Sequence, residues 1–288
     1  MNNRPFHEVR RRPFDAFQLA LFFPGLGQVY SGRLKRGLVV AVAEWLAESM
    51  LAVPLWQNFH VFLVGMILIA GVPLFGILDA IILARKTKRM ILQRFNRWYV
   101  YAIWIVVSYA LLFTLWTFVK SSRYQTYRQP TGSMEPTILP GELMMGDKGY
   151  YRSHPIFPGD VIVVRFKRDP AFVYIRRCIA LPGQVVQFRD RILNVDGKTW
   201  VLRGYSLGKR IPIQPIEFHD PNIVPPGAGN SDNYGPVTVP ANTVFVVADD
   251  IANGLDSRQW GFVDQSDIVG KALYIYFSPQ LERWGTPF

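Results

Sequence analysis

The chain changes character near residue 120. Before that point, long apolar runs alternate with short basic segments, and after it short β-branched and aromatic runs alternate with Pro and Gly. This pattern predicts an N-terminal α-helical transmembrane bundle followed by a mainly antiparallel β domain of barrel or sandwich type. We expect a basic N-terminus at 1–13, a membrane region at 14–119 and a second domain at 120–288.

Three runs in the membrane region are long enough to cross a bilayer. A helix needs about 20 predominantly apolar residues to span a hydrocarbon core of about 30 Å, and the runs at 37–56, 59–83 and 98–119 meet this requirement. The run at 14–30 is shorter and is broken by Pro24-Gly25, which favours an interfacial or re-entrant helix. We therefore expect three spans, with a fourth at 14–30 as the alternative.

Basic residues flank these runs and predict their orientation. Lys and Arg are dense between the last two runs, at Arg85, Lys86, Lys88, Arg89, Arg94 and Arg97. The positive-inside rule puts this segment in the cytoplasm. With three spans the N-terminus is then cytoplasmic too, the domain after residue 120 is extracytoplasmic, and the lipid bilayer is a partner of the chain.

Acidic residues also occur inside the apolar runs. Glu44 and Glu48 lie one helical turn apart, and Asp79 lies near the basic end of its run. Because a charge in lipid is costly, we expect Glu44 and Glu48 to face the helical bundle. A structural polar contact between helices is the simpler interpretation, and a transport or proton-relay role is the alternative.

The net charge of +11 does not indicate a nucleic-acid partner. Much of the basic excess lies beside the apolar runs, and the second domain contains no recognisable base-reading module. The single cysteine, Cys178, excludes an intrachain disulfide and a multi-cysteine metal site. Because no group of side chains has metal-ligand spacing, we expect neither a metal nor a cofactor.

The second domain has the pattern of short strands separated by turns. Runs rich in β-branched and aromatic residues occur at 160–166, 173–181, 185–188, 191–195, 199–202, 243–248 and 272–277. Asp196-Gly197 separates two of these runs as a two-residue hairpin turn does. The region 203–235 is rich in Pro, Gly and Asn and is expected to be a long loop or insertion.

One serine, Ser133, has neighbours that indicate chemistry. A serine after a glycine is usually a turn residue. Here, however, it belongs to the first of five motifs that follow one another along about 130 residues. The motifs are Gly-Ser-Met-x-Pro-Thr at 132–137, Pro-Gly-Asp-Val-Ile-Val-Val at 158–164, Tyr-Ile-x-Arg-x-x-Ala-Leu-Pro-Gly at 174–183, Tyr-Gly-Pro-Val-Thr-Val-Pro at 234–240 and Leu-Asp-Ser-Arg-Gln-Trp-Gly-Phe-Val at 255–263. Together they resemble signal peptidase I, a family of membrane-bound serine endopeptidases.

The resemblance implies a setting and a set of partners. It implies a multi-pass protein of the bacterial inner (plasma) membrane with a signal-peptidase-like β fold outside the cytoplasm. The partners would be signal peptides of exported preproteins and the protein-export machinery. Ser-Lys chemistry in this family uses no cofactor.

The resemblance also implies roles for particular residues. Ser133 matches the nucleophile that attacks the carbonyl after an Ala-x-Ala-like sequence, and the backbone N–H of Ser133 with the hydroxyl of Thr131 would form the oxyanion hole. Met134 would shape the pocket. Asp256 and Arg258 match an acidic and basic pair that braces the site in this family. A structural ion pair in a loop would have the same role.

The catalytic base departs from the family pattern. Members of the family have Tyr-Ile-Lys-Arg, whereas this chain has Arg176 at the position of the lysine. Burial can lower the pKa of a lysine to about 7 or 8, but arginine, at about 12.5 to 13.8, stays protonated. Holding an arginine neutral at pH 7 would cost about 8 kcal/mol. We therefore expect activity to be strongly reduced or absent.

Two further departures lie near the same point. The family's Gly-Asp-Asn appears as Ala248-Asp249-Asp250, and a serine that supports the lysine is replaced by Gly254. A substitute base is conceivable, and the candidates are Asp249, Asp250, His154, His219 and Lys167. Two functions stay open: a peptidase that cuts weakly or with another base, and a pseudo-peptidase that binds signal peptides or exported proteins without cutting them. Transport through the bundle is a third.

Overall fold

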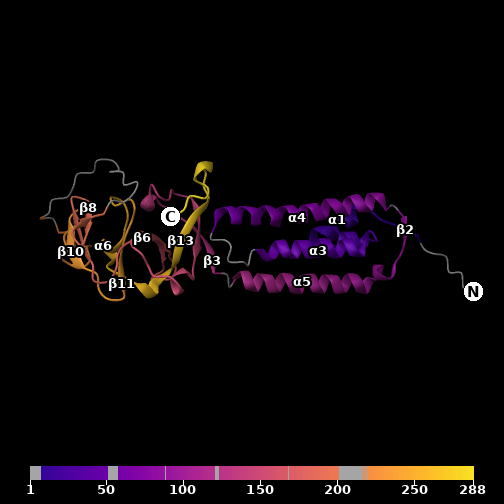
Figure 1. Cartoon of the computed structure of the whole chain (residues 1–288), viewed down its shortest axis with the longest axis horizontal. Coiled ribbons are helices and arrows are strands. Elements are labelled where there is room, and N and C mark those ends of the chain that lie inside the picture. Colours follow the sequence, from indigo (N-terminus) through magenta and orange to yellow (C-terminus); the bar gives the residue numbers. More distant parts are fainter. Residues whose placement is uncertain are drawn as a thin grey trace, which may run out of the picture. The chain divides into compact units, whose positions relative to one another are not determined.

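The computed structural model describes residues 8–50, 58–87, 89–120, 123–167, 169–200, 217 and 219–288. The chain forms two compact units, residues 1–122 and 123–288. The first unit is helical and the second is built mainly from strands (Figure 1). The predicted fold class, helices followed by an antiparallel β domain, is confirmed.

The described residues of the helical unit include five α-helices, whose longer members run alongside one another in Figure 1. Its elements are β1 (Glu8–Arg10), α1 (Pro13–Phe22), α2 (Leu26–Tyr30), α3 (Leu34–Ser49), α4 (Phe59–Lys86), β2 (Arg89–Ile91), the 3₁₀ helix η3 (Arg94–Asn96) and α5 (Trp98–Lys120). The break expected at Pro24-Gly25 lies between α1 and α2, where Gly25 has a φ of 75°. A side chain at position 25 would also collide with the backbone of Gly37, so this turn requires glycine.

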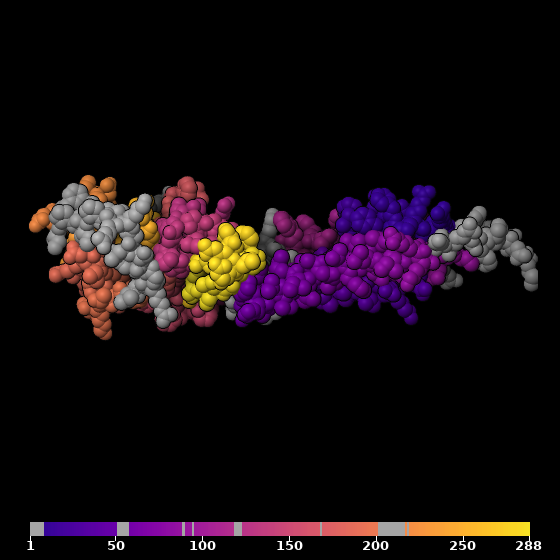
Figure 2. All heavy atoms as spheres, turned by 90° about the horizontal axis from the view of Figure 1, so that it is seen from above, coloured from indigo at the N-terminus to yellow at the C-terminus, as the bar shows by residue number. Residues whose placement is uncertain are grey.

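Two described helices are long and apolar enough to cross a membrane, α4 and the segment 98–117 of α5. Helix α4 forms a continuous surface of the unit in Figure 2. It exposes many large apolar side chains, which include Leu63, Val64, Met66, Ile67, Leu68, Leu74, Phe75, Leu78 and Ile82. Helix α3 has 16 residues, and 51–57 lie outside the described residues. The third predicted span, at 37–56, therefore stays a prediction.

A short antiparallel ribbon joins the two basic segments of this unit. Strand β1 pairs with β2, with Val9 opposite Met90 and Arg10 opposite Arg89. The sequence did not predict this pairing, because two three-residue strands carry no readable period. As a consequence, the residues before α1 lie beside those that follow α4.

A polar cluster links α2, α3 and α4. The carboxylate of Asp79 accepts hydrogen bonds from Gln28 and Arg36, and Gln28 also donates to the carbonyl of Gly76 at 2.7 Å. Glu44 is buried and packs directly against Gly76, where a Cβ would collide with its carboxylate. Glu44 therefore faces a neighbouring helix, as predicted, while Glu48 is half-buried.

In the described part of the second unit, the strands form two antiparallel sheets. The seven-stranded sheet has the order β12-β11-β6-β5-β13-β4-β3, and the four-stranded sheet has the order β10-β7-β8-β9. The strands are β3 (Tyr124–Arg128), β4 (Leu143–Asp147), β5 (Val161–Val164), β6 (Tyr174–Ala180), β7 (Val185–Arg189), β8 (Ile192–Val195), β9 (Lys198–Thr199), β10 (Tyr234–Thr238), β11 (Thr243–Val247), β12 (Val263–Asp264) and β13 (Ile268–Phe277). The short helices are η4 (Gly132–Met134), η5 (Tyr150–Arg152), α6 (Ser257–Trp260), η6 (Gln265–Asp267) and η7 (Leu281–Arg283).

The hairpin predicted at Asp196-Gly197 is confirmed. Val195 of β8 pairs with Lys198 of β9, and the two turn residues have φ values of 51° and 75°, as a two-residue turn with left-handed geometry requires. The predicted loop at 203–235 is described only in part: 201–216 and 218 lie outside the described residues, 219–233 forms turns, and β10 begins at Tyr234.

Strand β5 is the middle strand of the seven-stranded sheet and is covered on both faces. Val161 and Val163 pack in one apolar cluster with Met134 and Ile138, whereas Ile162 and Val164 pack in another that contains Cys178. An uninterrupted apolar run is what a strand buried on both faces requires. The first cluster holds Met134 in the core, and with it the short helix η4 that carries Ser133.

Candidate active site

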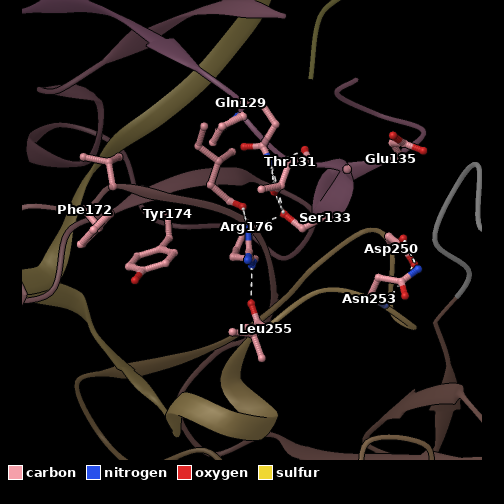
Figure 3. Close-up of a pocket in the computed structure, with 14 residues that line it drawn as sticks. Gln129, Thr131, Ser133, Glu135, Phe172, Tyr174, Arg176, Asp250, Asn253 and Leu255 are labelled. Carbon is pink, nitrogen blue, oxygen red and sulfur yellow. Dashed lines mark hydrogen bonds between the residues drawn. The ribbon is translucent and has the colours of Figure 1, made fainter. Parts of the chain in front are cut away.

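A cleft of about 620 Å³ opens in the β unit beside Ser133 and Arg176 (Figure 3). Its walls come from the segment around η4, from the residues before and within β6, and from the loop that precedes α6. The lining residues are Gln129, Pro130, Thr131, Gly132, Ser133, Glu135, Phe172, Val173, Tyr174, Ile175, Arg176, Asp250, Asn253 and Leu255. Segments far apart in sequence therefore meet at one concave site.

Three hydrogen-bond partners converge on the hydroxyl of Ser133. Its Oγ lies 3.0 Å from Nε2 of Gln129, 3.2 Å from Oγ1 of Thr131 and 3.1 Å from Nη1 of Arg176. The neighbouring Met134 is fully buried in the core, so η4 cannot turn without disturbing the packing. The hydroxyl is thus held in a fixed position and is surrounded by donors.

Arg176 reaches Ser133 from the buried strand β6. Its Nε donates to the carbonyl of Leu255 at 2.7 Å, its Nη1 also donates to the carbonyl of Ile175 at 2.6 Å, and its guanidinium lies 5.0 Å from the ring centre of Trp260. Burial lowers the pKa of Arg176 to about 10, and the opposing attraction of nearby acidic groups does not restore it. At pH 7 only about one molecule in a thousand then holds a neutral guanidine. Arg176 is therefore a donor to Ser133 and not a proton acceptor.

Asp256 and Arg258 form a fully buried ion pair next to the cleft. The guanidinium Nη2 lies 2.8 Å from the carboxylate of Asp256, and both side chains have 0% exposure. Arg258 also donates to the carbonyls of Ser231 and Ile251, while Asp256 accepts the backbone N–H of Ala248 and caps α6. The pair joins the loops around the cleft without contacting Ser133.

Gln129 is the neighbour of Ser133 that sequence reasoning missed. Its side chain is buried, and Nε2 donates to the carbonyl and hydroxyl of Thr131 as well as to Ser133. A lone glutamine before a Pro-Thr-Gly turn has no distinctive signal in the sequence. Its contribution is to fix Thr131 beside the serine, where a hydroxyl could stabilise an oxyanion.

The five candidate substitute bases are occupied elsewhere. Asp249 pairs with Arg177, Asp250 accepts from Asn253, His154 stacks on Tyr150, His219 contacts the carbonyl of Glu217, and Lys167 bonds Ser266. Asp250 lines the cleft, but its contact with Ser133 is made by the main chain: the backbone N–H of Asp250 donates to the carbonyl of Ser133 at 3.1 Å. Within the described ranges, no carboxylate, imidazole or amine bonds the Ser133 hydroxyl.

The departures at 248 and 254 are coupled by packing. A Cβ built on Gly254 would lie 2.0 Å from the Cβ of Ala248, far inside van der Waals contact. The methyl group of Ala248 thus fills the space in which a serine side chain at 254 would begin. Position 254 therefore cannot return to serine unless the methyl group at 248 is removed.

Comparisons with known proteins agree on one family. The family model described as "Signal peptidase, peptidase S26" matches residues 98–277. The chain is 31% identical over 188 residues to a probable signal peptidase I-1 of Synechocystis sp., with 63% of this chain and 82% of the relative covered. It is 28% identical over 214 residues to signal peptidase I of Aquifex aeolicus, covering 60% and 83%. A crystal structure of a signal peptidase I from Enterococcus faecalis V583 matches at 25% identity and a TM-score of 0.29, over 41% of this chain and 97% of that one.

Proposed function

Because this chain belongs to the signal peptidase family, peptidase S26, we propose that it recognises signal peptides of exported preproteins in the cleft beside Ser133 and cuts them slowly or not at all. The observation that carries the proposal is the contact between Nη1 of Arg176 and Oγ of Ser133 at 3.1 Å. A protonated guanidinium has five N–H donors and no acceptor. The group in the position of the family's lysine base cannot take the serine proton at neutral pH.

The absence of a base is expected to lower the rate of cleavage by a factor that can be bounded. General-base catalysis contributes about 10²–10⁴-fold to the rate of a reaction of this kind. Binding is not affected in the same way, since the cleft, its apolar lining and the position of Ser133 do not depend on a neutral lysine. Recognition without efficient cleavage is the function that fits both facts.

Weak cleavage is the second candidate function, and the position of the Thr131 hydroxyl beside Ser133 favours it. Thr131 Oγ1 lies 3.2 Å from Ser133 Oγ and is held in place by Gln129. Oxyanion donors alone preserve part of the catalysis of serine hydrolases when the base is removed. A preprotein bound in the correct register would then be cut slowly at its Ala-x-Ala site.

The membrane setting belongs to the same proposal. The β domain at 120–288 would lie outside the cytoplasm of a bacterial cell, with the N-terminus at 1–13 inside and the membrane region at 14–119 between them, where export machinery could deliver preproteins. Helix α4 has 28 residues, about 42 Å of rise, and it ends near β2, which pairs with β1. Because β1 and the start of α4 lie at opposite ends of that helix, the intervening chain has to cross as well, which supports three spans.

The pH dependence of cleavage tests the assignment of Arg176. Any rate that depends on Ser133 should rise about tenfold per pH unit above pH 7 and level off near pH 10, because the neutral fraction of Arg176 rises in that way. The measurement is cleavage of a purified preprotein by the detergent-solubilised chain, with Ser133→Ala as the control. A profile that is flat from pH 7 to 10, and falls only at acidic pH, would indicate a carboxylate or imidazole base and contradict the assignment.

A further inference from the structure

Arg176 is a buried cation without an anionic partner. Its side chain is 6% exposed, and within the described part of the chain it makes no ion pair. The nearest acids are already engaged, since Asp249 pairs with Arg177 and Asp256 with Arg258. A buried charge without a partner is strongly unfavourable, so an anion that reached this guanidinium would be bound tightly.

The third nitrogen of the guanidinium is available to such an anion. Nε and Nη1 of Arg176 donate to protein oxygens, whereas Nη2 has no hydrogen bond among the described residues and is not sealed from solvent. Arg176 lines the cleft, so an anion in the cleft can reach Nη2. The Ser133 hydroxyl lies 3.1 Å from Nη1 of the same guanidinium and also lines the cleft, so it can donate to an anion held by Arg176.

The rest of the cleft fits a peptide better than a small ion. Its volume of about 620 Å³ is roughly 20 times the share of one water molecule in the liquid. Apolar side chains line it beyond Arg176, and two of them, Phe172 and Leu255, are 61% and 58% exposed. Such a site can hold the side chains of a peptide while the guanidinium holds its charged end.

We propose that this cleft binds the free C-terminal carboxylate of a peptide, with the carboxylate against Arg176 and the Ser133 hydroxyl. The ligand class is a peptide that ends in small residues, which is the end that a cut signal peptide carries. This inference rests on the proposed function, because it uses the same cleft. It changes the preferred ligand from an intact preprotein to a chain that has already been cleaved.

The test compares two peptides that differ only at the C-terminus. A fluorescein-labelled peptide ending in Ala-x-Ala is prepared as the free acid and as the amide, and its binding to the full detergent-solubilised chain is followed by fluorescence polarisation. Charge-assisted hydrogen bonds are worth about ten- to a hundredfold in affinity, so the acid should bind that much more tightly than the amide. The preference should fall below about twofold in Arg176→Gln, and it should persist in Lys167→Gln, which removes an exposed cation bonded to Ser266 outside the cleft.

Each outcome decides between the proposals. Equal affinity for the acid and the amide in the unmodified chain would overturn the carboxylate inference and leave peptide recognition intact. If neither peptide binds, and the same peptide extended beyond Ala-x-Ala does not bind either, the proposed function is overturned as well. Inorganic phosphate should displace the acid poorly. Displacement at concentrations comparable to those of the peptide would show a general anion site and overturn the choice of a peptide.

Discussion

Changing Arg176→Lys, Ala248→Gly and Gly254→Ser together is expected to raise the rate of preprotein cleavage by about 10²–10⁴-fold. The lysine supplies a side chain whose pKa burial can lower into the neutral range, whereas Arg176 keeps a pKa of about 10 in the same place. The change Gly254→Ser would restore the hydroxyl that supports the lysine in the family this chain resembles. Cleavage of one purified preprotein by the full chain, at pH 7 to 8, measures the gain.

The single variants separate chemistry from packing. Arg176→Lys alone should give a smaller gain, because the new amine would lack the supporting hydroxyl. Gly254→Ser alone should destabilise the domain by about 1–3 kcal/mol, since its Cβ would lie 2.0 Å from that of Ala248. Ala248→Gly should remove part of that loss, because the Cβ would still lie 2.9 Å from the carbonyl oxygen of Asp250. If the triple variant folds and binds the preprotein but cuts no faster than the unmodified chain, Arg176 is not what disables the site.

Asp256→Asn is expected to destabilise the β unit by about 3–5 kcal/mol. The change leaves the guanidinium of Arg258 buried without its anion, and both side chains have 0% exposure. For a domain of this size the loss corresponds to a fall in the melting temperature of roughly 6–20 °C. Thermal unfolding of the full chain in detergent, followed by tryptophan fluorescence, measures the shift.

A matched control removes a carboxylate of the same type where it is exposed. Asp190 lies at the β7–β8 turn with a φ of 50°, a conformation that asparagine tolerates. Asp190→Asn should therefore change the stability by no more than about 0.5 kcal/mol. A similar melting temperature for the two variants would mean that the Asp256–Arg258 pair does not brace the site.

Local sequence patterns predicted much of the fold. The run at 160–166 predicted a strand and Asp196-Gly197 predicted a tight turn, because both signals depend on neighbours along the chain. Strands β3 and β4 were missed, since Tyr124–Arg128 and Leu143–Asp147 mix polar, flexible and glycine residues. These strands are defined by pairing with each other and with β13, which no local pattern records.

The residues of the candidate site were predicted from the resemblance to a family more than from the chemistry of each local segment. The order of the motifs associated Ser133 with Arg176, which the fold brings to 3.1 Å. The position of Gln129 and the collision between positions 248 and 254 depend on side-chain packing. The sequence could not exclude Asp249 or Lys167 as bases, because their partners Arg177 and Ser266 lie 72 and 99 residues away along the chain.

In the proposed function, the cleft recognises a signal peptide while the Ser133 proton has no acceptor at neutral pH. The most direct measurement incubates a purified preprotein with the unmodified chain at pH 7, isolates the complex, and determines the mass of the bound preprotein. We predict a complex in which the preprotein is intact, with the same complex formed by Ser133→Ala. Rapid release of a product cut after Ala-x-Ala, abolished in Ser133→Ala, would contradict the claim and show that a working base is present.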